Sequence, residues 1–95
     1  MQPSGMNPKQ AMQMRKMQKE LAKEVAEVEA GDGAVKIQIN GEQKVKDVTL
    51  DPERTQDQEK LEKWLESAIT QAISKSQQIA ADKMKSMGGD LDLGM

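Results

Sequence analysis

Basic side chains are concentrated near the N-terminus of this 95-residue chain. Residues 1–23 hold five basic residues against one acidic residue, a local balance of +4, whereas the whole chain has a formal net charge of −2. The five are Lys9, Arg15, Lys16, Lys19 and Lys23. At about 100° per residue of α-helix, the first, third and fifth fall on one face and Lys19 lies beside them. This pattern predicts a basic end on an acidic protein, and the residues alone leave open whether it is a solvated face or a binding surface.

Residues that could support catalysis or bind a metal are scarce. The chain has no Cys and no His, so neither a disulfide nor a conventional zinc site can form. It also lacks a Gly-x-Ser-x-Gly elbow, a Ser-x-x-Lys pair and a glycine-rich phosphate loop. Acidic residues such as Glu20, Glu24 and Glu27 recur at the spacing of a solvated helix surface. We therefore expect no enzymatic activity, no cofactor, no metal and no small-molecule substrate.

The middle of the chain predicts a β-hairpin. Val35, Ile37 and Ile39 alternate with polar residues, which is the period of a half-buried strand. Asn40-Gly41 follows, a dipeptide that readily accepts the positive φ angles of a tight hairpin turn. A second β-rich run then extends over residues 45–50.

The second run has an irregular apolar pattern. Val48 and Leu50 share one parity, whereas Val45 has the other. A bulge near Lys46-Asp47 would return Val45 to the buried face, and without one Val45 would point towards a helix or a second subunit. Asp51-Pro52 closes this strand.

A helix is predicted before the hairpin, from Lys9 to about Glu27, because this segment contains strong helix formers and no Gly or Pro. Its apolar stripe, at spacings of three and four, consists of Met14, Met17, Leu21, Val25 and Val28. Residues 28–30 could instead form a short strand beside the hairpin, giving three antiparallel strands.

A second long helix is predicted after the hairpin, to about Met87, where Gly88-Gly89 would end it. Thr55 with Gln58 matches a capping box, and Asp57 is an alternative cap. The helix has a broad apolar face made of Leu61, Leu65, Ala68, Ile69, Ala72, Ile73, Ile79, Ala80 and Met84. We expect Trp64, at the edge of this face, to cover one end of the core or a dimer seam.

These elements predict one α+β domain over residues 9–87, between a flexible lead at 1–8 and a disordered tail at 88–95. The expected core and dimer residues are Val35, Ile37, Ile39, Val48, Leu50, Leu61, Leu65, Ile69 and Ile73. A chain this short, with 36% hydrophobic residues and one aromatic, buries little apolar surface alone, which favours a partner chain. No apolar run approaches the roughly 20 residues needed to cross a bilayer and no signal peptide follows Met1, so we expect a soluble cytoplasmic protein.

The hairpin and its surroundings resemble a known family. Residues 35–41 (VKIQING), the spaced Val45, Val48 and Leu50, then Asp51-Pro52, then Leu61-Glu62 and the helix segment 68–72 are similar to the YbaB/EbfC family of bacterial nucleoid-associated proteins. The resemblance covers about residues 9–87. This chain has Thr70-Gln71 where the family often has Asn-Asp, and Ile69 where it often has Phe.

The resemblance implies an intertwined homodimer whose first helices project as the arms of a tweezer and grip DNA. On that basis we expect Lys9, Arg15, Lys16, Lys19 and Lys23 to contact phosphates of duplex DNA, with weak sequence selectivity. A single Trp with no Phe or Tyr gives little support for stacking on single strands. The expected role is nucleoid organisation and gene regulation. The alternative is a dimeric adaptor whose Met-rich first helix docks on another protein, which the net charge of −2 favours.

Overall fold

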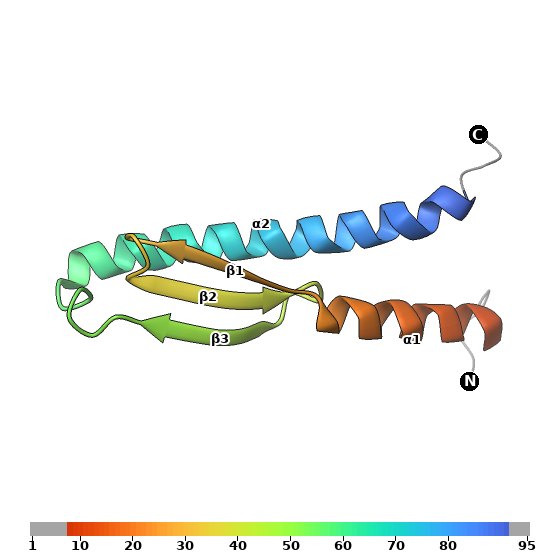
Figure 1. Cartoon of the computed structure of the whole chain (residues 1–95), viewed down its shortest axis with the longest axis horizontal. Helices are drawn as coiled ribbons and strands as arrows, with labels where there is room; N and C mark the ends of the chain where they lie inside the picture. The colour runs from red at the N-terminus through yellow and green to blue at the C-terminus, as the bar shows by residue number, and fades with distance from the viewer. Residues whose placement is uncertain (1–7, 92–95) are drawn as a thin grey trace.

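The computed structural model describes the backbone of residues 8–91 and the side chains of residues 8–86. Along the chain its elements are α1 (Pro8–Lys23), β1 (Val25–Ala30), β2 (Val35–Asn40), β3 (Val45–Leu50) and α2 (Gln58–Leu91). The strands form an antiparallel sheet in the order β1-β2-β3, which confirms the predicted α+β class and its third strand. Figure 1 shows α2 lying along the sheet, while α1 extends beyond one end of it.

The first helix is shorter than predicted. It begins at Pro8, whose fixed φ suits a first helical position, and ends at Lys23 instead of about Glu27. Val25 and Val28 therefore lie in β1 and not on a helix stripe, so this part of the prediction was wrong. In β1 the buried Val28 and Ala30 alternate with exposed Glu27 and Glu29. Pairing with β2 holds these residues in a strand, where alternate side chains are buried and exposed. This tertiary contact outweighs the helix propensity of Glu and Ala.

A bulge lies in β3 where the apolar parity changes. Ile37 pairs with Val48 and Gln38 with Asp47, but Ile39 pairs with Val45, so the register shifts by one residue. The extra residue is Lys46, which confirms the predicted bulge. Because directly paired residues share a face of the sheet, the three apolar residues of β3 face the same side as those of β2.

The core lies between α2 and the first two strands. Its buried members are Val28, Ala30, Val35, Ile37, Ile39, Ala68 and Ala72, and Leu61, Trp64 and Leu65 pack against them. The two alanines place only a methyl group between α2 and the sheet, so the backbones approach closely. On the β1 flank of α2, Gln71 Nε2 donates a hydrogen bond to the Glu29 carbonyl at 3.2 Å.

The turn between β1 and β2 is held by Trp64 and Arg54. Gly31 has φ +64°, and a Cβ there would lie 2.5 Å from the Trp64 ring. Trp64 therefore covers this end of the sheet, one of its two expected roles. Arg54 Nη1 donates to the Asp32 carbonyl at 2.9 Å, and its Nε contacts Asp51 Oδ2 at 2.8 Å. The hydrogen bond from Arg54 lowers the pKa of the Asp51 carboxyl from its ordinary value.

The structure of α2 tests two predictions, one about its N-terminal cap and one about the residue at which it ends. Asp57 is the N-cap, because its Oδ1 accepts a hydrogen bond from the Lys60 amide at 3.2 Å. The Thr55 hydroxyl donates instead to the Asp51 carbonyl at 2.6 Å. The helix continues through Gly88-Gly89 to Leu91, so the predicted end near Met87 was wrong: a helical glycine weakens a helix by about 1 kcal/mol relative to Ala but does not terminate it. The expected flexible lead lies mostly outside the described residues, as do residues 92–95 of the expected tail.

The loop between β2 and β3 differs from a tight hairpin turn. Asn40, expected on the polar face, is only 1% exposed. Its Oδ1 accepts hydrogen bonds from the Glu42 and Lys44 amides at 2.9 and 3.0 Å, closing a four-residue loop. Gln43 takes the positive φ of this loop (64°), and Gly41 does not. The prediction of a positive φ at Gly41 was wrong. Gly41 is a glycine here because its backbone lies against Leu21 of α1 and Ile79 of α2, where a side chain would clash.

Candidate nucleic-acid interface

Helix α1 projects from the body of the protein. It has no buried residue, and Figure 1 shows most of its length lying past the end of the sheet. Only its C-terminal turn is tied to the sheet, where the Leu21 carbonyl accepts a hydrogen bond from the Gly41 amide at 2.9 Å. The helix therefore presents most of its surface for binding, although Ala11, Met17, Glu20, Leu21 and Ala22 are half-buried.

All five predicted DNA-contacting side chains, from Lys9 to Lys23, are exposed on α1. At about 1.5 Å per residue the fourteen steps between the two end residues span roughly 21 Å along the helix axis. The structure brings three of the five together, since Arg15, Lys16 and Lys19 line a shallow hollow with Met12. Lys9 and Lys23 stand apart from this cluster, near the two ends of the helix.

Among the side chains of residues 8–86, the positive charges of α1 have no ion-pair partner. Lys23 lies in the last helical turn, where the helix dipole favours a cation. These groups are therefore available to anionic groups in solution.

One acidic residue borders this basic cluster and was not predicted from the sequence. Glu42, in the loop between β2 and β3, lines a second hollow together with Arg15, Gln18, Lys19 and Ala22. Residues 15 and 42 are far apart in the sequence, and nothing in the local pattern around Glu42 indicates their proximity. They line the same hollow because the loop packs against the end of α1.

A second feature is an exposed apolar surface beside α2, which we call the apolar face. It consists of Val45, Val48, Leu50, Ile69 and Ile73, each 41–51% exposed. The strand pairing turns β3 towards the side that α2 occupies, but α2 packs on β1 and β2. Gln71 marks the β1 flank of α2, and at 100° per residue Ile69 and Ile73 lie on the opposite flank, towards β3.

The predicted core and dimer residues thus divide into two groups. Val35, Ile37 and Ile39 are buried within the single chain, and Leu61 and Leu65 are partly buried against them. The other four belong to the apolar face: Val48, Leu50, Ile69 and Ile73. Periodicity in the sequence does not separate the two groups, because both lie on the same faces of their strands and helix.

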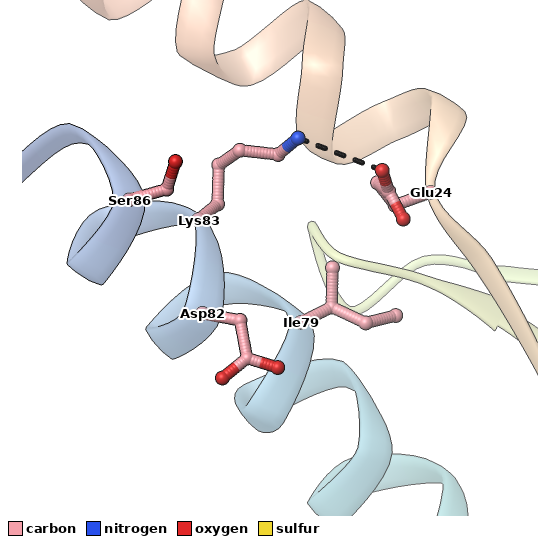
Figure 2. Close-up of a pocket in the computed structure, with 5 residues that line it drawn as sticks. All are labelled: Glu24, Ile79, Asp82, Lys83 and Ser86. Atoms are coloured by element: carbon pink, nitrogen blue, oxygen red, sulfur yellow. Dashed lines mark hydrogen bonds and ion pairs between the residues drawn. The ribbon is translucent and has the colours of Figure 1, made fainter.

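A third hollow separates the end of α1 from the later turns of α2. Figure 2 shows it lined by Glu24, Ile79, Asp82, Lys83 and Ser86. Lys83 Nζ reaches across it to Glu24 Oε1 at 3.5 Å. Glu24 and Lys83 form an ion pair with each other, whereas the cations of the basic cluster on α1 have no such partner within residues 8–86. Within residues 8–91, no helix combines the length and apolar character that crossing a membrane requires.

The chain therefore combines a three-stranded antiparallel sheet, a long covering helix and a projecting basic helix. The family model described as the YbaB/EbfC DNA-binding family matches residues 5–91. The chain belongs to this family, as the resemblance predicted. The description of the family is that of DNA-binding proteins.

Related proteins agree with this assignment. A nucleoid-associated protein of Chloroflexus aurantiacus is 40% identical over 81 residues, covering 83% of this chain and 81% of its own. Another, from Syntrophobacter fumaroxidans, is 34% identical over 96 residues, covering 94% and 87%. The crystal structure of an uncharacterized protein from Helicobacter pylori matches with a TM-score of 0.70 at 17% identity, covering 81% of this chain and 92% of that one. This last similarity concerns the fold alone.

Proposed function

We propose that this protein binds duplex DNA as a homodimer, through the basic side chains of α1, and acts in nucleoid organisation and gene regulation. The carrying observation is the set of five exposed cations, unpaired within residues 8–86, on a helix that projects from the body. The names of the relatives place those proteins at the nucleoid, and we extend that location to this chain.

The mechanism is electrostatic. Lys and Arg side chains that neutralise DNA phosphates release condensed counterions, so affinity falls steeply as salt rises. The guanidinium of Arg15 can contact a phosphate through two parallel hydrogen bonds, whereas the lysines act as point charges. Such contacts position a protein on the duplex without reading its sequence. We therefore expect the protein to bind duplexes of different sequence with similar affinity.

The apolar face supports the homodimer. Five large apolar side chains exposed together on a small domain are typical of an interaction surface. A second copy that covered this face would complete the core over β3 and bring a second α1 into the assembly. Two basic helices on one particle would grip DNA more tightly than one, because the second contact is intramolecular.

Charge-neutralising substitutions on α1 test the proposal. The triple variant Arg15→Gln, Lys16→Gln, Lys19→Gln removes the clustered cations, six in the dimer. Each phosphate that the variant no longer neutralises makes the slope of log affinity against log salt shallower by about 0.9, so we expect a change of up to roughly 5. The measurement is fluorescence anisotropy of a labelled duplex across a salt series.

The matched control changes three cations away from α1: Lys36→Gln, Lys60→Gln and Lys63→Gln. These side chains are exposed on β2 and on the first turns of α2. Both triple variants have the same net charge, so a purely global charge effect would weaken them equally. Equal affinities for the two variants would refute the assignment of DNA contacts to α1.

The alternative function is a dimeric adaptor that uses α1 to bind another protein. The exposure of Met12 and Met14, at 69% and 49%, favours it, since methionines suit adaptable helix contacts. The same salt series separates the two functions. A flat salt dependence of DNA binding argues for protein contacts, and a steep one argues for phosphates.

A further inference from the structure

The loop between β2 and β3 contacts both helices at once. Asn40 Nδ2 donates a hydrogen bond to the Ala22 carbonyl in the last turn of α1 at 3.3 Å. The Asn40 carbonyl accepts one from the hydroxyl of Ser76 on α2 at 2.7 Å. Asn40 and Ser76 are the two buried polar side chains among residues 8–86, at 1% and 0% exposure. One buried asparagine therefore joins the end of α1, through its side-chain amide, to the middle of α2, through its main-chain carbonyl.

Gly41 completes this junction. Its amide donates to the carbonyls of Leu21 and Glu24 at 2.9 and 3.1 Å. A Cβ at this position would lie 2.7 Å from Ile79 Cγ2 and 3.0 Å from Leu21 Cδ2. The loop backbone thus fits between the two helices only because residue 41 has no side chain.

The junction satisfies backbone groups that a helix end leaves open. The last four carbonyls of an α-helix have no partner within the helix and usually bond to water or to a local cap. Here the carbonyls of Leu21 and Ala22 bond to the sheet loop. The direction of α1 is therefore coupled to the sheet, although α1 itself has no buried residue.

We infer that Asn40, Gly41 and Ser76 are positioning residues for DNA binding, which fix the direction in which α1 leaves the body. We call these three residues the anchor. The inference rests on the proposed function. A helix already held in its binding direction loses less conformational freedom on binding, so the anchor raises affinity without touching DNA.

The ion pair between Glu24 and Lys83 is a second tie between the helices, but a weaker one (Figure 2). The Glu24 side chain is 53% exposed and the atoms are 3.5 Å apart. Solvent screens such a pair, and exposed pairs contribute little on average. The buried hydrogen bonds of the anchor are not screened in this way.

Two variants test the anchor. Ser76→Ala removes the hydroxyl and leaves the volume nearly unchanged, and Gly41→Ala removes no hydrogen-bonding group but displaces Ile79 or α1. The control is Ser74→Ala, the same change at an exposed position of α2. The chain has no Cys, so spin labels can be placed at Gln13→Cys on α1 and Gln78→Cys on α2. Pulsed electron spin resonance then measures the distance between the helices, with labelled chains diluted in unlabelled ones.

We expect Ser76→Ala and Gly41→Ala to broaden or shift this distance and to weaken duplex binding about 3- to 10-fold. Ser74→Ala should change neither. Trp64 fluorescence, which reports on the far end of the sheet, shows whether the body stays folded. If Ser76→Ala unfolds the body, the comparison rests on Gly41→Ala.

Two results would overturn the inference: distances like those of the control, whatever the affinity, or altered distances with unchanged affinity. The first shows that the anchor does not set the direction of α1, and the second shows that this direction does not affect DNA binding. Failure of the proposed function has a different signature. In that case the unsubstituted protein itself does not bind duplex DNA, whatever the distances show.

Discussion

At the scale of single residues, side chains distant in sequence decide what the basic helix can do. Glu42 illustrates this, because it lines a hollow together with Arg15 and Lys19 on α1. A negative charge beside two cations that we propose to contact phosphates lowers the local positive potential and repels an approaching phosphate. We therefore expect the cluster to attract DNA less strongly than its own charges suggest.

Substituting Glu42 tests this effect. We expect Glu42→Gln to strengthen duplex binding about two- to fivefold at low salt, with the gain shrinking as salt screens the charge. The control is Glu53→Gln, which removes an equal charge from the exposed loop after β3. Equal gains from both variants, measured by anisotropy titration, would show a general charge effect and no special role for Glu42.

At the scale of elements, short loops determine how the strands and helices meet. The loop between β1 and β2 places Gly31 beneath the Trp64 ring, which secures the end of β1 to α2. The loop between β2 and β3 inserts between the helices and holds the end of α1. The two ends of the sheet therefore have separate roles, one for the stability of the body and one for the direction of α1.

The first loop gives a stability prediction. Gly31→Ala combines a strained positive φ with a Cβ 2.5 Å from the Trp64 ring, and we expect it to lower the free energy of unfolding by about 2–4 kcal/mol. Gly33→Ala, at φ +88°, meets no atom closer than 3.5 Å and adds only the backbone strain, about 1 kcal/mol or slightly more. Urea unfolding followed by Trp64 fluorescence measures both. If both variants lowered the free energy of unfolding equally, the close approach to the Trp64 ring would make no contribution of its own.

At the scale of the whole molecule, one chain buries part of its apolar surface and leaves the rest exposed. The core lies under α2 on β1 and β2, while the apolar face extends over β3 and one flank of α2. In the proposed dimer this face meets a second copy, and the two basic helices are carried by one particle. Folding and assembly then depend on different residues of the same sheet.

Two Asp substitutions separate these processes. Ile37 is 3% exposed, so Ile37→Asp buries a charge in the core and should unfold the chain. Ile69 is 49% exposed, so Ile69→Asp should leave each chain folded but dissociate the dimer. Thr70→Asp, on the exposed surface next to it, is the control and should do neither. Sedimentation and circular dichroism measure mass and fold; a dimer that survives Ile69→Asp would contradict the assigned interface.

Local patterns in the sequence were sufficient for much of this fold. The alternation of Val35, Ile37 and Ile39 identified the central strand, and the changed parity of Val45 identified the bulge. The boundary between α1 and β1 was misplaced because residues 24–28 suit a helix and a strand alike, and pairing with β2 decides between them. Local propensity carries no information about that distant partner.

The sequence by itself determined the class of fold, the family and the concentration of positive charge on the first helix, because periodicity, composition and motif spacing are local properties. Only the tertiary structure decided which apolar residues form the core and which form the exposed face, that Glu42 borders the basic cluster, and that Asn40-Gly41 holds the end of α1. Each of these depends on contacts between segments far apart in the chain. Such contacts arise when α2 packs on the sheet and when the loop between β2 and β3 packs against the end of α1. The local pattern of one segment carries no information about its distant partner.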